Sequence, residues 1–142
     1  MRDNGGVLST GEISARQELA QRSGGKIHIT HTPTGYTRVG GLRKETMDGV
    51  VNFQKESGVV VKIVGGSENI VHSKRGKYTH ANGYKVDIED TPEVNNFIES
   101  HYEKLDISQF ARKDITAAYS DGKGNIYYRE ATHWDVCYQC KG

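Results

Sequence analysis

The order of hydrophobic and polar residues predicts a helix with one buried face in three stretches of the chain. The first covers residues 10–21 and ends before a Ser-Gly-Gly stop, and the second covers residues 42–57 and ends at Gly58. The third begins at Thr91, a capping residue followed by Pro and Glu, and runs to Leu105. The predicted inward faces consist of Ile13, Leu19 and Ala20; of Met47, Val50, Val51 and Gln54, at spacings of three and four; and of Val94, Phe97, Ile98, Tyr102 and Leu105.

Alternating or β-branched runs between these helices predict strands. A hairpin is expected where two such runs flank Asp-Gly-Lys-Gly at residues 121–124. This order of elements predicts an α+β fold, with helices packed on a small, mainly antiparallel sheet. The predicted strands lie around Ile27 and Ile29 and over residues 59–64, 84–88, 115–119, 125–128 and 133–138.

The chain of 142 residues is long enough for one domain with one modest core. No linker, repeat or low-complexity segment divides it, so we expect a single domain over residues 1–142, with a core at about 42–138. Residues 1–10 are expected to form a loose leader, and the polar, basic residues 67–79 a flexible loop. Seventeen glycines against two prolines favour a fold with many turns.

Charge and hydropathy give no support for nucleic-acid binding or for membrane functions. Nineteen basic and eighteen acidic residues give a formal net charge of +1, which offers no argument for nucleic acid or an anionic membrane as a partner. No apolar run approaches the roughly 20 residues that a membrane helix needs. The N-terminus carries charge without an apolar stretch behind it, so we expect no secretory signal.

Cys137 and Cys140 are the two cysteines, and they form a Cys-x-x-Cys pair near the C-terminus. A redox pair and half of a zinc clip are two interpretations of this spacing. A four-thiolate site would need a second pair, and a redox pair usually opens a helix. The sequence therefore favours two ordinary thiols at the end of a strand.

Four side chains form the candidate chemistry: His80, Asp87, Glu130 and His133. Two imidazoles and one carboxylate are the ligand set of a catalytic zinc ion, which keeps a further position for water. Alternation over residues 84–88 directs Asp87 away from the core face, and a nearby carboxylate such as Glu130 can act as a base on water. The chain has six histidines, so two histidines and an acid can occur together in the sequence by chance. From the residues alone, a structural role is therefore an alternative for each histidine.

The two motifs together, His-x-x-Gly-x-x-x-Asp at residues 80–87 and Glu-x-x-His at residues 130–133, resemble a family of zinc peptidases. These enzymes cleave D-Ala-D-Ala and L-Ala-D-Glu bonds in bacterial cell walls, and they include carboxypeptidases, dipeptidases and phage endolysins. The likeness covers roughly residues 42–138. It implies that His80, Asp87 and His133 bind zinc at the edge of the sheet and that Glu130 is the catalytic acid and base.

Two positions depart from the family pattern. Tyr78 stands where the family often has Ser, and residues 65–68 read Gly-Gly-Ser-Glu where the family often has Ser-Gly-Tyr-Arg. The family's Arg can hold a substrate carboxylate. Arg75 is a candidate substrate-binding replacement, with a solvated surface charge as the alternative. Loss of this Arg disfavours an exopeptidase and favours an endopeptidase that cuts within the stem peptide.

Trp134 and Asp135 directly follow the last predicted ligand, His133. Trp134 alternates away from His133 and is expected in the core, although a Trp beside a zinc site can also bind substrate. Asp135 shares the face of His133 and could orient a ligand, but the pattern favours a plain surface acid. The remaining histidines have no partners at a recognisable spacing and are expected to be structural or exposed: His28, His31, His72 and His101.

The resemblance implies a zinc hydrolase whose partner is cell-wall peptidoglycan, with no nucleic acid and no membrane insertion. Without a secretory signal, we expect delivery by phage lysis, by a virion or by another export route. A domain of a larger phage tail, conjugation or secretion assembly fits the same chemistry. Hedgehog signalling domains share the ligand pattern and serve as binding modules, so a catalytically silent zinc domain is the alternative function.

Overall fold

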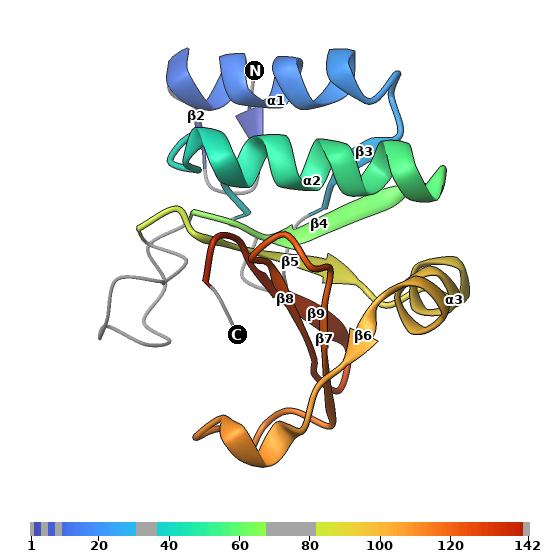
Figure 1. The fold of residues 1–142 in the computed structure, drawn as a ribbon. Coiled ribbons are helices and arrows are strands. Elements are labelled where there is room, and N and C mark those ends of the chain that lie inside the picture. Colours follow the sequence, from blue (N-terminus) through green and yellow to red (C-terminus); the bar gives the residue numbers. More distant parts are fainter. Residues whose placement is uncertain (1, 4–5, 8–9, 31–36, 68–81, 141–142) are drawn as a thin grey trace.

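The computed structural model describes residues 2–3, 6–7, 10–30, 37–67 and 82–140. Helices and a mostly antiparallel sheet make up an α+β fold (Figure 1), as predicted. The helices are α1 (Thr10–Arg22), α2 (Lys44–Ser57), α3 (Pro92–His101) and a short 3-10 turn, η1 (Ile107–Gln109). The strands are β1 (Arg2–Asp3), β2 (Gly6–Val7), β3 (Ile27–Ile29), β4 (Val61–Gly65), β5 (Lys85–Glu89), β6 (Glu103–Lys104), β7 (Ala117–Ser120), β8 (Ile126–Arg129) and β9 (His133–Cys137).

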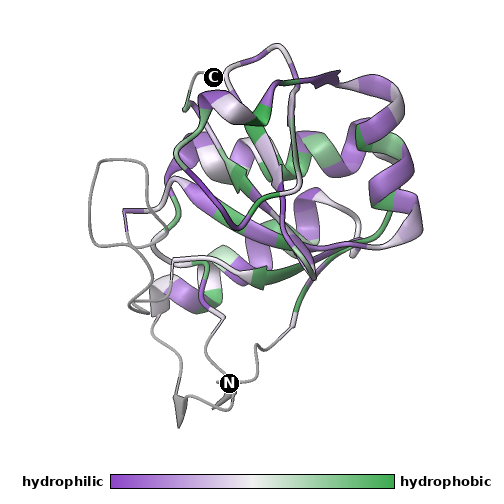
Figure 2. Cartoon of the chain, turned by 90° about the horizontal axis from the view of Figure 1, so that it is seen from below, coloured by the Kyte–Doolittle hydropathy of each residue, from purple (hydrophilic) through white to green (hydrophobic). Residues whose placement is uncertain are grey.

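The second helix forms where the apolar spacing predicts it. Met47, Val50, Val51 and Gln54 are all buried. Figure 2 shows hydrophilic and hydrophobic residues side by side along the helices, as expected of elements that bury one face. Gly58 ends α2 in the left-handed region at φ 69°, and its N–H donates to the carbonyl of Gln54.

The third helix begins as predicted but ends earlier. The Thr91 hydroxyl accepts the N–H of Val94 and caps the first turn. Tyr102 is already extended, at φ −108° and ψ 156°, because the next residues form β6 and pair with β7. The predicted apolar stripe through Leu105 is therefore wrong at its end. Leu105 packs instead against a small cluster on the other face of the sheet.

The main sheet has the strand order β3-β4-β5-β9-β8-β7-β6. β3 and β4 are parallel, and the other neighbouring pairs are antiparallel. The hairpin predicted across residues 121–124 is β7 and β8. β5 and β9 lie at the centre of the order, so side chains on these two strands are neighbours across the middle of the sheet.

The two faces of the sheet are covered differently. On one face, Val86, Ile88 and Val136 pack with α1, α2 and α3 into the main core. The opposite face carries a smaller cluster, formed by Ile115, Ala118, Ile126, Tyr128 and Cys137, that packs against residues around η1. Asp87 and Asp135 are on this second face, because they alternate with the core residues of their strands.

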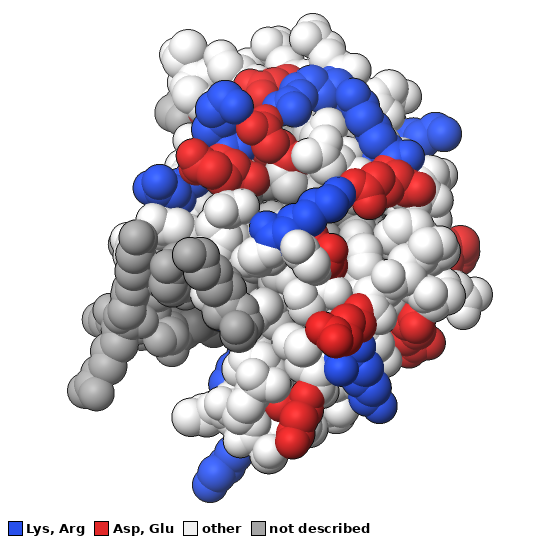
Figure 3. Space-filling model, viewed as in Figure 1, with Lys and Arg blue, Asp and Glu red and all other residues white. Residues whose placement is uncertain are grey.

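Several expectations about the chain's ends and surface can be compared with the fold. Within residues 1–10, expected to be a loose leader, β1 and β2 form a short antiparallel ladder. In the described part of the chain, every helix is too short or too polar to cross a bilayer. Lys and Arg side chains are interspersed with Asp and Glu over the face in Figure 3. The loop expected at 67–79 lies, beyond Ser67, outside the described residues.

Cys137 and Cys140 form a disulfide, with their Cα atoms 5.7 Å apart. The interpretation as two ordinary thiols is therefore wrong. A turn after β9 brings the sulfurs together, with Gln139 in the left-handed region at φ 61°. Strand alternation alone could not predict this turn.

Candidate metal centre

Asp87, Glu130 and His133 come together on the second face of the sheet. Each offers one ligand atom, and these atoms lie within 4.8 Å of one another. His133 Nε2 lies 3.3 Å from Glu130 Oε2 and 3.7 Å from Asp87 Oδ1. The three side chains are 20–24% exposed, so the group is sheltered but open to solvent. The predicted convergence is confirmed for these three residues.

The sheet register explains the meeting. Asp87 on β5 pairs with Asp135 on β9, and His133 lies two residues before Asp135 on the same face. The N–H of Glu130 donates to the carbonyl of His133 at 2.9 Å, which closes the turn between β8 and β9. This turn returns the Glu130 carboxylate over the start of β9, so residues far apart in sequence share one site.

The position of this group differs from the expected one. A site at the edge of the sheet is wrong for these three residues, because β5 and β9 are central strands with neighbours on both sides. His80 and Arg75, the predicted first ligand and substrate-binding residue, lie outside the described residues.

Two glycines allow close packing around β5, the strand that carries Asp87. Gly65 pairs with Asp87 across β4 and β5, and a methyl group on Gly65 would lie 2.6 Å from Asp87 Oδ2. Gly83 has φ 81°, and a Cβ there would clash with the carbonyl of Gly41. The Gly83 carbonyl accepts the Thr46 hydroxyl at 2.7 Å, which ties the chain before β5 to α2.

The electrostatics of the group favour a cation. The hydrogen bond that the His133 ring donates to the Glu130 carboxylate raises the pKa of His133 above its ordinary value, against the opposing effect of burial, and the charge of Asp87 adds to the rise. An imidazole between two carboxylates therefore attracts a positive charge, which a proton or a metal ion can supply. Carboxylate oxygens and an imidazole nitrogen are donors that suit divalent cations. Asp87, Glu130 and His133 could thus hold a metal ion.

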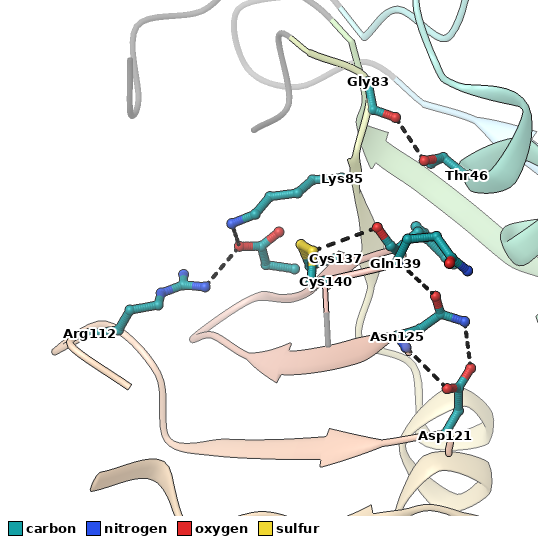
Figure 4. Close-up of a disulfide and its surroundings, with 11 residues drawn as sticks. Thr46, Gly83, Lys85, Arg112, Asp121, Asn125, Cys137, Gln139 and Cys140 are labelled. Atoms are coloured by element: carbon teal, nitrogen blue, oxygen red, sulfur yellow. Dashed lines mark hydrogen bonds and ion pairs between the residues drawn. A yellow bond between two sulfur atoms is a disulfide. The ribbon is translucent and has the colours of Figure 1, made fainter. Parts of the chain in front are cut away.

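A network of charged residues that the sequence did not predict borders the group. Asp135 is 4% exposed, so the expectation of a surface acid is wrong. Its Oδ2 accepts Lys85 Nζ at 3.2 Å and Arg112 Nη1 at 3.0 Å. Figure 4 shows Lys85 and Arg112 approaching this carboxylate from two sides. Arg112 Nη2 also lies 3.3 Å from Glu130 Oε2, which joins the network to the candidate ligands.

Arg112 escaped prediction because it lies in irregular chain between η1 and β7, where no periodicity indicates its direction. Alternation did place Asp135 on the same strand face as His133. It could not indicate that residues around η1 cover that face and bury the carboxylate. A buried acid needs a cation or several donors, so the burial itself would have been the signal.

The other predicted residues that the structure describes lie away from this site. Trp134 is fully buried in the main core, and its Nε1 donates to Asn95 Oδ1 at 2.8 Å. It therefore does not line the site, and its core interpretation is confirmed. His28 and His101 are exposed, as expected, and His101 stacks on Phe97. His31 and His72 lie outside the described residues.

Comparisons of the chain with protein-family models, with curated proteins and with solved structures found no match. The group of Asp87, Glu130 and His133, which could hold a metal ion, is therefore the main guide to a function.

Proposed function

We propose that this chain is a zinc-dependent peptidase that hydrolyses a peptide bond in the stem peptide of peptidoglycan. The observation that carries the proposal is the convergence of Asp87 on β5 with Glu130, in the turn before β9, and His133, at the start of β9. The same three residues belong to the two motifs that resemble the cell-wall zinc peptidases. In this assignment His80 is the remaining ligand.

The residues divide into ligands and a base. His80, Asp87 and His133 would hold the zinc, which when bound would lower the pKa of a water toward about 7 and polarise the scissile carbonyl. Glu130 takes the proton from the attacking water and passes it to the leaving amine. Its carboxylate lies 3.3 Å from His133 Nε2, close enough to the ligands for this role.

An endopeptidase is favoured over a carboxypeptidase. An exopeptidase needs a cation free to bind the substrate's terminal carboxylate. In the described part of the site, Arg112 is the arginine beside Glu130, and Asp114 and Asp135 already engage its guanidinium. A substrate that presents an internal peptide bond does not need such a cation. The engaged guanidinium of Arg112 therefore supports the proposal of cleavage within the stem peptide, at L-Ala-D-Glu or a similar bond.

Replacement of the base tests the assignment directly. Glu130→Gln should bind zinc in the same ratio as the wild type, measured by elemental analysis. Its turnover of purified peptidoglycan should fall by about 10²–10⁴-fold, the range for loss of a general base. Mass spectrometry of the released muropeptides identifies the bond. Glu93→Gln is the matched control, because Glu93 is an exposed acid in the first turn of α3, and it should keep full activity.

The possible outcomes separate the candidate functions. Equal turnover of Glu130→Gln and wild type would refute Glu130 as the base. A wild-type protein that binds one zinc but cleaves no wall preparation would be a silent binding module of the hedgehog kind. If the wild type binds no zinc, and the zinc content of His133→Ala is the same as that of the wild type, the metal site itself is rejected.

A further inference from the structure

Arg112 makes an unusually complete set of contacts next to the candidate base. Its Nε and Nη2 donate to the two oxygens of Asp114 at 3.0 and 2.7 Å. Its Nη1 donates to Asp135 Oδ2 at 3.0 Å, and its Nη2 also reaches Glu130 Oε2 at 3.3 Å. The guanidinium carbon lies 4.7 Å from the centre of the Tyr128 ring. The arginine is therefore fixed from several directions.

These contacts fix the plane of the guanidinium before it meets Glu130. The paired bonds to Asp114 set its orientation, and stacking on Tyr128 prevents it from tilting. Asp135 is itself held by Lys85, so the anchor does not depend on Arg112 alone. A planar, pre-organised fork loses little freedom when it binds a further carboxylate.

Glu130 Oε2 lies between two partners, Arg112 Nη2 at 3.3 Å and His133 Nε2 at 3.3 Å. A glutamate side chain has several rotamers, and without a fixed partner part of the population would adopt rotamers in which the carboxylate cannot act as the base. The contact with Arg112 restricts the carboxylate to the position beside the ligand His133. The placement of a general base strongly affects turnover, because small displacements remove the near-attack geometry.

We propose that Arg112 is a positioning residue that holds the Glu130 carboxylate beside the metal ligands, with Asp114, Asp135 and Tyr128 as its support. The inference rests on the proposed function, in which Glu130 is the base. Arg112 touches neither metal nor substrate in this role. Its effect is on the orientation of Glu130 and therefore on turnover, and not on substrate affinity.

Arg129 offers a matched control for Arg112. It pairs with Asp90 at 2.8 Å, lies 5.1 Å from the Trp134 ring centre and is 24% exposed, against 23% for Arg112. Both arginines thus combine a carboxylate with an aromatic ring at the same exposure. Arg129 precedes Glu130 in the chain but pairs with Trp134 on β9. Of these two arginines, Arg112 alone contacts the Glu130 carboxylate.

The experiment compares Arg112→Gln, Arg112→Lys and Arg129→Gln as full-length, zinc-loaded proteins. Arg112→Gln should lose about 10- to 100-fold in kcat on purified peptidoglycan, with KM and zinc content within about twofold of wild type. Arg112→Lys should recover part of kcat, because it keeps the charge but not the fork. Arg129→Gln should keep wild-type kcat. Crystal structures should show the Glu130 carboxylate displaced in Arg112→Gln and unmoved in Arg129→Gln.

Each outcome decides the proposal. An Arg112→Gln protein with wild-type kcat would overturn it, as would an unmoved Glu130 carboxylate in that variant's crystal structure. A kcat loss matched by Arg129→Gln would also overturn it, because it would report stability alone. If the wild type binds zinc and cleaves nothing, the proposed function fails. The crystal structures then still decide whether Arg112 holds Glu130.

Discussion

Gly65 on β4 lies opposite Asp87 on β5, and the lack of a side chain at Gly65 makes room for the Asp87 carboxylate. A methyl group on Gly65 would lie 2.6 Å from Asp87 Oδ2 and 3.1 Å from Asp87 Cβ and Cγ. Gly65 is itself buried, so the strand cannot simply move aside. The geometry of one candidate ligand thus depends on a residue with no chemistry of its own.

Replacement of Gly65 by Ala should therefore weaken metal binding. The Asp87 carboxylate must rotate away from His133, and we expect the zinc affinity to fall by about 10- to 100-fold, as when support for a ligand is lost. The affinity is measured by competition with a chelator. Gly11→Ala is the control, because no atom lies within 4 Å of a Cβ there. Equal zinc affinities in the two variants would contradict the packing argument.

The raised pKa of His133 predicts how the metal-free protein responds to pH. Glu130 stabilises the charged imidazole most, and Asp87 adds to this against the effect of burial. Because the folded pKa lies above the ordinary value of about 6.5, the stabilisation is complete below pH 6.5 and disappears as pH rises through the folded pKa. With a chelator present, Tm should thus fall across this window more in wild type than in His133→Asn.

With zinc present, Tm should no longer fall as the pH rises through this window, since the metal takes the place of the proton on the imidazole. Zinc affinity, measured by calorimetric titration, should rise with pH through the same window. Parallel Tm profiles for wild type and His133→Asn, without metal, would show that the proton on His133 does not stabilise the fold. A pH-independent zinc affinity would show that His133 is not a ligand.

Local sequence signals predicted most elements of this fold. The spacing of Val50 and Val51, the cap at Thr91 and the stop at Gly58 each depend on nearby residues, so they could be recognised without tertiary information. Alternation along β5 likewise placed Asp87 on the face away from the core. These signals indicate which way a side chain points.

Other features depend on what covers a face, and no local pattern carries that information. Asp135 is buried because the chain around η1 packs over its face, and Arg112 reaches it from that irregular chain. The disulfide between Cys137 and Cys140 depends on a left-handed turn at Gln139. The motif pairing did predict the meeting of Asp87, Glu130 and His133, because a ligand set constrains residues far apart in the sequence.

Asp135 should be important for stability, since it is the buried anion shared by Lys85 and Arg112. Asp135→Ala leaves two cations without this partner and should lower the free energy of unfolding by about 3 kcal/mol. Asp90→Ala is the control, because its single pair with Arg129 is more exposed, and it should cost less than about 1 kcal/mol. Urea unfolding measures both. Similar costs for the two variants would contradict the role of Asp135.

Reduction of the disulfide should lower stability without disturbing the metal centre. The bridge closes a loop of four residues, and its loss should lower the free energy of unfolding by about 2 kcal/mol. The turn it closes also holds the β7–β8 connection, because the N–H of Cys140 donates to the Gly124 carbonyl and that of Gln139 to Asn125 Oδ1. Urea unfolding with and without reductant measures the change, with the Cys137→Ala/Cys140→Ala protein as a control that should not respond.

Cys137 and His133 lie at opposite ends of β9, so zinc affinity should stay the same. A midpoint that does not move on reduction would show that the bridge adds nothing to the fold, and a fall in zinc affinity would couple it to the site.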